Sequence, residues 1–306
     1  MKLNEIRTFV AVAEAQSVQE AGHRLGLTQS AVSRLIQRLE AELGVSLFDR
    51  QTKPLALTRD GELALAHARR VLKASDDLAD AFAAAQPRGL LRLGVTHVLM
   101  AVAAREPLDR LRAAFPGLTV RLQADWSTSM VEQVRSGALD GGLLLMAEGQ
   151  TPPADLAGRC LSREPVRMIA AAHRAAQGPW SLPAMNAAGW VLQPEGCMYR
   201  SAMVQALAHH GLPLNVTVEA FDQTLLVGLV ARGVGFGLAP LGLIAATAGT
   251  DRVRALEVPG FALTVSVWLI RSRAAGRIGP VLDVLEDSLA ARLGASPAPA
   301  LHSAAE

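Results

Sequence analysis

The stretch TQSAVSRLIQRLEAEL, residues 28–43, decides how the N-terminal part of the sequence folds. Its large aliphatic residues recur every three or four positions, which predicts one helix with a single apolar stripe. The stripe consists of Val32, Leu35, Ile36, Leu39 and Leu43. The opposite face offers only hydroxyl, amide and guanidinium groups before Glu40, through Ser30, Ser33, Arg34 and Gln37. One face of this helix is therefore expected to be buried and the other to make polar contacts.

A second, shorter helix precedes this one and is marked by its ends. Ser17 and Glu20 have the spacing of a capping box, in which each side chain bonds a free backbone N–H group. Gly26 suits the left-handed residue at which a helix stops, and Thr28 is a good cap for the next helix. Two helices joined by such a short turn predict a helix-turn-helix.

The polar face of the 28–43 helix has the chemistry needed to read DNA. Hydroxyl, amide and guanidinium groups can donate and accept hydrogen bonds at base edges and phosphates in a major groove. Between Arg24 and Arg59 six basic residues stand against three acidic ones, a local surplus that would steer the segment toward DNA. The alternative is an ordinary solvated helix face, because helical hairpins are common.

Residues 45–58 predict a small β-wing, because two short apolar runs flank a polar turn. Arg50 and Lys53 lie at its tip, where they would contact the sugar-phosphate backbone without reading sequence. The next segment, from about Arg59 to Ala85, predicts one helix of about 40 Å. Its sparse apolar stripe would remain exposed to solvent if this were a lone linker helix. A dimerisation helix, which packs against a second copy, is therefore favoured.

At this point the sequence resembles the LysR-type transcriptional regulators. The matching positions are dense over about sixty residues, which makes the match specific. They are Phe9, Val12, Ala13, Glu14, Ser17, Ala21, Leu25, residues 28–33, Ile36, Leu39, Glu40, Leu43, Gly44, Leu47, Phe48, Arg50, Leu57, Thr58 and Gly61. Gly22 departs from the pattern, since the family usually has a second Ala there.

The resemblance implies that the chain binds double-stranded promoter DNA as a homodimer, which in this family usually assembles further into a homotetramer. RNA polymerase is a further expected partner. The candidate DNA-binding residues are Thr28, Gln29, Ser30, Ser33, Arg34, Gln37, Arg50 and Lys53.

From Gly89 onward the resemblance continues, and strand-like runs alternate with helical ones, which predicts βαβ units on a parallel sheet. The family folds this α/β half into two lobes joined by crossing strands, as in periplasmic solute-binding proteins. The expected organisation is a winged helix-turn-helix domain at 1–58, a linker and dimerisation helix at 59–88, an effector-binding domain at 89–293 and a disordered tail at 294–306. Within the effector domain, lobe I is expected at 89–161 and 268–293, and lobe II at 162–267.

Ligands bind at the carboxyl ends of strands in such sheets, and this rule selects candidate effector residues. Thr96 and His97 follow the first strand, and Ser127, Thr128 and Ser129 follow the second. Helix N-termini attract anions, so the three hydroxyl residues could hold one. The alternative is that these hydroxyls only cap a helix.

The second lobe contributes the loop 193–200 and a residue after a later strand, Phe221. Cys197 and Tyr199 are candidates for the pocket lining, with a small packed residue as the alternative for Cys197. Arg200 could pair with a ligand carboxylate, or alternatively form an ion pair with an acid such as Glu195. Phe221 would close the far wall. The effector is therefore expected to be a small molecule, including a carboxylate or another anion.

Composition excludes several other classes of protein. Of the 306 residues half are hydrophobic, and the net charge is only +2. Cys160 and Cys197 make neither a disulfide framework nor a zinc motif, so no metal and no cofactor are expected. Charged residues in the first apolar stretch argue against a signal peptide, and the longest uncharged run, 233–250, contains five Gly and a Pro. We expect a cytoplasmic bacterial protein without a membrane partner.

Two other functions compete with a ligand-gated transcription factor. A solute-binding protein for transport is disfavoured by the DNA-binding hairpin and by the missing signal peptide. A small-molecule enzyme is disfavoured because the sequence contains no G-x-S-x-G elbow, nucleotide loop or metal cluster. The sequence therefore predicts a regulator and not an enzyme.

Overall fold

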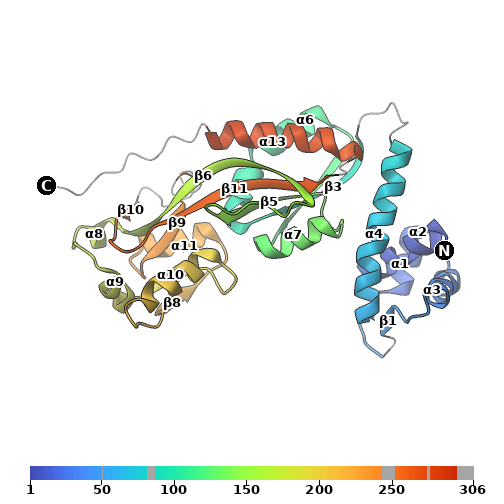
Figure 1. Ribbon diagram of the computed structural model, residues 1–306, viewed down its shortest axis with the longest axis horizontal. Coiled ribbons are helices and arrows are strands. Elements are labelled where there is room, and N and C mark those ends of the chain that lie inside the picture. The colour runs from blue at the N-terminus through green and yellow to red at the C-terminus, as the bar shows by residue number, and fades with distance from the viewer. Residues whose placement is uncertain (50, 81–86, 241, 243–251, 274–275, 295–306) are drawn as a thin grey trace. The chain divides into compact units, whose positions relative to one another are not determined.

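The computed structural model describes residues 1–49, 51–80, 87–240, 242, 252–273 and 276–294. The chain divides into two compact units (Figure 1). One contains the N-terminal residues through the long helix, and the other contains most of the chain from Pro87 onward. Arg50, the end of the predicted dimerisation helix and the predicted tail from 295 lie outside the described residues.

Three helices begin the N-terminal unit, and their boundaries follow the capping signals. They are α1 (Leu3–Ala15), α2 (Val18–Leu25) and α3 (Gln29–Leu43). The Ser17 hydroxyl accepts the Glu20 N–H at 3.3 Å, and Thr28 accepts the Ala31 N–H at 3.3 Å. Gly26 ends α2 in the left-handed region, at φ 65°. The predicted helix-turn-helix is confirmed.

The core of this unit forms where α1, α2 and α3 meet the wing. Val32, Ile36 and Leu39 of α3 are buried, whereas Leu43 at the end of the predicted stripe is 43% exposed. The Phe9 and Phe48 rings meet edge to face, with centroids 5.5 Å apart. Burial of this stripe turns the polar face of α3 outward.

The wing consists of β1 (Phe48–Asp49) and β2 (Ala56–Leu57), which pair antiparallel as predicted. Helix α4 (Arg59–Asp80) follows at once. The Leu47 carbonyl accepts the Thr58 N–H at 3.0 Å, and the Thr58 hydroxyl accepts the Gly61 N–H at 2.9 Å. A Cβ at Gly61 would overlap the Leu47 carbonyl oxygen, so this close approach of helix and wing requires Gly.

A seven-stranded sheet organises the second unit, in the order β10-β6-β11-β5-β3-β4 with β9 beside β6. Parallel pairs join β3 to β4 and β5, and antiparallel pairs join β11 to β5 and β6. The strands are β3 (Gly89–Val95), β4 (Leu118–Ala124), β5 (Gly141–Ala147), β6 (Leu156–Ala171), β9 (Gly237–Pro240), β10 (Val253–Leu256) and β11 (Leu263–Ser272). A separate parallel pair is formed by β7 (Trp190–Leu192) and β8 (Val216–Glu219).

Helices cover this framework as two lobes (Figure 1). The first lobe carries α5 (Met100–Ala103), α6 (Glu106–Ala114), α7 (Ser127–Arg135) and α13 (Gly279–Gly294). The second lobe carries α8 (Ala172–Ala175), α9 (Leu182–Ala188), α10 (Met198–Ala208) and α11 (Gln223–Ala231). Short 3₁₀ helices lie at His97–Leu99 and Gly276–Ile278. Within the described chain, every helix is too short or too polar to span a bilayer.

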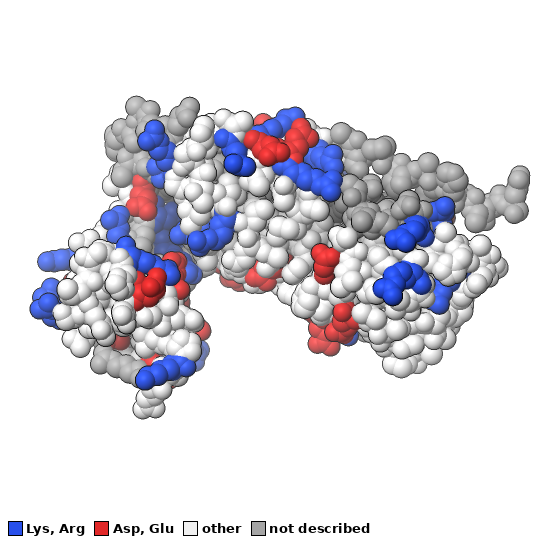
Figure 2. Space-filling view, turned by 180° about the vertical axis from the view of Figure 1, so that it is seen from behind, with Lys and Arg blue, Asp and Glu red and all other residues white. Residues whose placement is uncertain are grey.

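Ion pairs attach α13 to the long strands. Arg159 of β6 contacts Glu286 at 3.0 Å and Asp287 at 3.2 Å, and Arg271 of β11 contacts Asp283 at 2.6 Å. Figure 2 shows acidic and basic side chains side by side where α13 and α6 lie. Mostly exposed pairs of this kind contribute little stability each, so the packed apolar face of α13 holds the helix.

The long strand β6 belongs to both lobes. Its first half pairs with β11, and its second half pairs with β9 and β10. The expected lobe boundaries, 161/162 and 267/268, therefore fall inside β6 and β11 and not in connecting loops.

Candidate functional site

The outward face of α3 is the first candidate site. Thr28, Gln29, Ser30, Arg34 and Gln37 are exposed, and Ser33 is half-buried. The Arg34 Nε donates to the Ser30 carbonyl at 3.3 Å, and the Thr28 and Ser30 hydroxyls lie 3.2 Å apart. These contacts stay within α3, so the arrangement presents a row of donors and acceptors to solvent.

The acids of α3 are engaged at its C-terminal end, away from this row. The Glu40 carboxylate accepts the Leu47 N–H at 2.8 Å, and Glu42 pairs with the N-terminal ammonium group. The first turn of α3 contains no acid. An acid-free helix face of this kind can approach a polyanion without like-charge repulsion.

At the wing, Lys53 is exposed in the turn between β1 and β2, as its predicted position requires. Arg50, the other residue assigned to the tip, lies outside the described residues. Along α4, Leu63 and Leu78 are 62% and 66% exposed, and Val71 is 39% exposed. An apolar groove of about 350 Å³ lies between α4, α1 and α3. This leaves an uncovered apolar strip on the helix predicted to dimerise.

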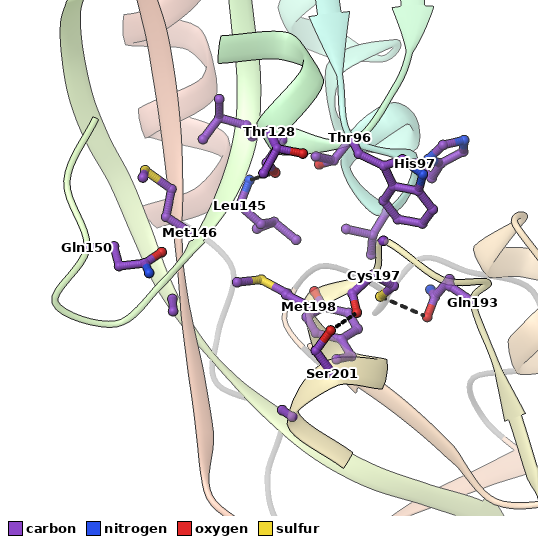
Figure 3. A pocket seen from close by; sticks show the side chains of 18 of the residues that line it. Thr96, His97, Thr128, Leu145, Met146, Gln150, Gln193, Cys197, Met198 and Ser201 are labelled. Atoms are coloured by element: carbon purple, nitrogen blue, oxygen red, sulfur yellow. Dashed lines mark hydrogen bonds between the residues drawn. The ribbon is translucent and has the colours of Figure 1, made fainter. Parts of the chain in front are cut away.

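The second candidate site is a cavity of about 590 Å³ between the two lobes of the second unit (Figure 3). The first lobe contributes residues that follow β3, begin α7 and end β5. The second lobe contributes the loop before α10 and the first turns of that helix. A cavity of this size accommodates a small organic molecule.

Four of the predicted effector residues line the cavity from the first lobe: Thr96, His97, Ser127 and Thr128. The Thr96 hydroxyl and the His97 Nδ1 are buried, and neither has a hydrogen-bond partner among the described residues. Ser127 does not simply cap a helix: its hydroxyl accepts the Leu145 N–H of β5 at 3.2 Å. The fifth predicted residue, Ser129, lies outside the lining and donates to the Asp125 carboxylate at 2.7 Å.

Asp125 occupies the N-terminal end of α7, a role that sequence reasoning missed. Its carboxylate accepts the Trp126 N–H at 2.7 Å as well as the Ser129 hydroxyl. From the sequence, this helix end could either hold an anion or carry hydroxyl caps only. The structure shows that the chain's own carboxylate already lies there, which weakens the attraction for a second negative group.

From the second lobe, Cys197 and Tyr199 line the cavity as predicted. The Cys197 thiol donates to the Gln193 side-chain carbonyl at 3.6 Å, and Gln193 donates to Gln223 at 2.8 Å. Burial raises the pKa of the Cys197 thiol and raises the pKa of the Tyr199 phenol well above its ordinary value. The Tyr199 hydroxyl has no hydrogen-bond partner among the described residues.

Arg200 and Phe221 do not line the cavity. The Arg200 guanidinium pairs with Glu219 and not with Glu195. It also donates to the backbone carbonyl of Gln193 at 3.4 Å. Arg200 therefore follows the ion-pair alternative, with an acid on β8 that the sequence did not single out.

Phe221 instead joins an aromatic cluster that bridges the lobes. Its ring centroid lies 5.5 Å from that of His97 and 6.1 Å from that of Trp126, and the last two are 5.2 Å apart. Gly196, at φ 95°, packs its backbone against the Trp126 indole. The cluster holds the loop before α10 and the start of α11 against the first lobe.

Several lining residues escaped the sequence analysis, chiefly at the end of β5 and on α10. They are Met146, Gln150, Met198, Ser201 and Gln205. Only their position could have indicated them in the sequence, because β5 is a neighbour of β3 in the parallel part of the sheet and its end lies at the same edge. No group of three metal-ligating side chains occurs within the described residues.

A winged helix-turn-helix unit joined to a two-lobed unit with an interlobe cavity defines a DNA-binding regulator that responds to a small molecule. Residues 3–62 match the family of bacterial regulatory helix-turn-helix proteins of the lysR type, and residues 84–293 match the LysR substrate binding domain. The chain belongs to the LysR family of transcriptional regulators. The expectation of a regulator and not an enzyme is confirmed by this membership.

Curated relatives span most of the chain. The regulator IlvR from Caulobacter vibrioides is 30% identical over 247 residues, which cover 79% of this chain and 83% of that protein. The regulator CbbR from Rhodospirillum rubrum is 27% identical, with 92% of this chain and 94% of that protein covered.

Solved structures share the fold at lower identity. A full-length OxyR variant from Pseudomonas aeruginosa has a TM-score of 0.75 and 22% identity, with 94% of both chains covered. Full-length CbnR in complex with its target DNA has a TM-score of 0.61 and 21% identity, with 95% of this chain and 100% of that chain covered. LysG from Corynebacterium glutamicum, solved with bound effector arginine, has a TM-score of 0.63 and 19% identity, with 94% and 98% covered.

Proposed function

We propose that α3 of this LysR-type regulator enters the major groove of promoter DNA. The observation that carries the proposal is the exposed, acid-free face of α3, whose side chains can bond base edges and phosphates. The contact residues would be Thr28, Gln29, Ser30, Ser33, Arg34 and Gln37. Lys53 and Arg50 of the wing would hold the sugar-phosphate backbone. CbnR, which shares this fold, was solved with its target DNA.

The proposed binding form is a homodimer through α4, whose exposed leucines would be covered by a second copy. Two recognition helices in a two-fold dimer read half-sites about 34 Å apart, or a multiple of this distance. Pairing of dimers into a homotetramer and contact with RNA polymerase complete the proposed assembly. DNA binding would place this activity in the bacterial cytoplasm, where the chromosome lies.

The proposed switch is a small-molecule effector in the interlobe cavity, held by Thr96, His97, Ser127, Thr128, Cys197 and Tyr199. A ligand shifts an equilibrium only if it binds one arrangement better than the other. The cavity meets this condition because its walls come from both lobes, so any change in their angle alters the contacts. LysG, another protein of this fold, was solved with bound arginine as its effector.

Replacement of Arg34 by Ala tests the DNA contact. Loss of a base contact from α3 should weaken binding by about 1–3 kcal/mol, or roughly 5- to 150-fold in the dissociation constant. Gel-shift titration of the full-length protein on a duplex selected from random DNA by the wild-type protein measures this change. Arg110→Ala is the matched control, because Arg110 is an exposed arginine of α6 in the second unit. Equal affinity of the Arg34→Ala and wild-type proteins would refute the assigned role.

A further inference from the structure

The cavity walls carry no permanent charge. Among the described residues that line the cavity there is no Arg, Lys, Asp or Glu. The raised pKa values of the Cys197 thiol and the Tyr199 phenol keep both groups neutral near pH 7. His97 is the only lining side chain in this described set that can become positive. A buried ionic ligand would therefore meet almost no opposite charge.

The charged groups beside the cavity are engaged elsewhere. Arg200, the nearest sequence candidate for binding a carboxylate, is paired with Glu219. The N-terminus of α7 holds the Asp125 carboxylate. At α10, the N-cap residue is Cys197, whose side chain makes no capping hydrogen bond and places no charge at that helix end. The α7 end is thus not a vacant anion site, and the Asp125 carboxylate there would repel a second negative charge.

The cavity nevertheless offers built hydrogen-bonding groups. Thr96 is 6% exposed and Tyr199 is 1% exposed, and both hydroxyls lack a partner among the described residues. Buried polar atoms are rarely left unsatisfied in folded proteins, so these two atoms behind the cavity wall point to enclosed ordered water. Figure 3 shows Thr96 and His97 across the cavity from Cys197 and Ser201.

The remaining lining is apolar. The end of β5 contributes Leu144, Leu145 and Met146, and α10 contributes Met198 and Ala202. Figure 3 shows Leu145 and Met198 on opposite sides of the space. Burial of apolar ligand surface against these side chains is favourable, whereas an ionised group gains nothing from them.

We infer that the effector is an uncharged, largely apolar molecule with one or two hydrogen-bonding groups, such as an amide or an alcohol. The inference replaces the anionic effector that Arg200 and the α7 terminus suggested from the sequence. It rests on the proposed function in one respect, which is that the interlobe cavity is the effector site. Polar side chains of the lining, among them Thr128, Gln150 and Ser201, would bond the polar group, and the apolar β5 and α10 side chains would hold the rest.

The test compares two probes that differ only in charge, 2-naphthamide and 2-naphthoate. Isothermal titration calorimetry on the full-length protein measures both dissociation constants at pH 6.0 and pH 8.0. The expected result is at least about tenfold tighter binding of 2-naphthamide at both pH values, a difference of about 1.4 kcal/mol. Equal or tighter binding of 2-naphthoate at either pH, or no measurable binding of either probe, would overturn the inference.

A charge introduced at the cavity edge locates the site. Gln150 lines the cavity and is exposed, so Gln150→Lys can place an ammonium group there without burying it. This variant should bind 2-naphthoate more tightly than wild type does by up to about fivefold, as expected for an exposed ion pair. The matched control is Gln177→Lys, at an exposed turn outside the cavity lining. In this variant the ratio of the two probe dissociation constants should equal that of wild type. If the ratio of the 2-naphthamide and 2-naphthoate dissociation constants is the same in Gln150→Lys as in wild type, the probes do not bind in this cavity.

Gel shifts on the same samples separate this inference from the proposed function. Loss of probe binding with intact DNA binding would refute only the ligand class or its site. If the wild-type protein does not bind DNA, the DNA-binding proposal is refuted. The ratio of the two probe dissociation constants would still test the ligand class.

Discussion

Replacement of Gly61 by Ala tests how the wing is held against α4. A Cβ at this position would overlap the Leu47 carbonyl oxygen and lie 3.0 Å from the carbonyl carbon. The same oxygen accepts the Thr58 N–H at 3.0 Å. The obstruction is backbone and not the end of a flexible side chain, so the start of the wing must move to admit a methyl group.

The change in unfolding free energy follows from three contributions, of which one stabilises the variant and two destabilise it. Ala stabilises a helix by about 0.5–1 kcal/mol relative to Gly. Overpacking typically costs about 1–3 kcal/mol, and loss of the bond between Thr58 and Leu47 adds about 1 kcal/mol. The net expectation is that the N-terminal unit loses about 1–3 kcal/mol of unfolding free energy.

Urea unfolding of the full-length protein can assign this loss to one unit. All four tryptophans, at 126, 180, 190 and 268, lie in the second unit, so their fluorescence reports that unit alone. Far-UV circular dichroism reports the helices of both units. Gly61→Ala should move the dichroism transition of the N-terminal unit to lower urea by roughly 1 M. The fluorescence transition should stay in place.

Gly228→Ala is the matched control, because Gly228 lies in α11 with open space around an added Cβ. There the ordinary helix preference should prevail and stabilise the second unit by about 0.5–1 kcal/mol. An N-terminal unit that is unchanged or more stable in Gly61→Ala would refute the reasoning, since it would mean that the Leu47 backbone yields without cost. Gel shifts should show weaker DNA binding by Gly61→Ala, because the wing moves with Leu47.

Two further predictions concern the second unit. Burial raises the pKa of the Glu164 carboxyl. The folded state therefore binds the proton more tightly than the unfolded chain, and stability falls as pH rises from about 4.3 through the raised folded pKa. Glu164→Gln should remove this slope and raise the thermal midpoint at pH 7, and a pH profile identical to wild type would contradict the assignment. Arg200→Ala removes a partly exposed ion pair and should cost about 1 kcal/mol or less in thermal unfolding. Binding of 2-naphthamide should be unaffected by Arg200→Ala. If the variant no longer bound 2-naphthamide, Arg200 would have to be counted among the ligand-binding residues.

Sequence reasoning succeeded in the N-terminal unit because its signals are local. Ser17, Gly26 and Thr28 act on backbone groups within four residues, so their spacing alone sets the helix ends. The predicted stripe on α3 is buried at Val32, Ile36 and Leu39, whereas Leu35 is half-buried and Leu43 is exposed, because the core covers only part of this face. Periodicity indicates which face is buried but not how far a neighbouring element extends.

The cavity was harder to predict, because its properties depend on contacts between distant residues. Six of the nine effector candidates line it, since the carboxyl ends of parallel strands can be located from the pattern. The partner of Arg200 could not be identified, because Glu219 lies on a strand of the other βα unit. Asp125 could have been recognised, since Asp is a preferred residue at helix N-termini.

The strand β6 limits how the two lobes can move. Its sixteen residues form one strand that pairs first with β11, with a register shift at Leu161, and then with β9 and β10. A loop hinge would let one lobe swing freely, whereas here a rotation has to be absorbed as twist along a hydrogen-bonded ribbon. A change of lobe angle on ligand binding would then appear as torsion of β6, and substitutions along β6 far from any ligand should alter the response.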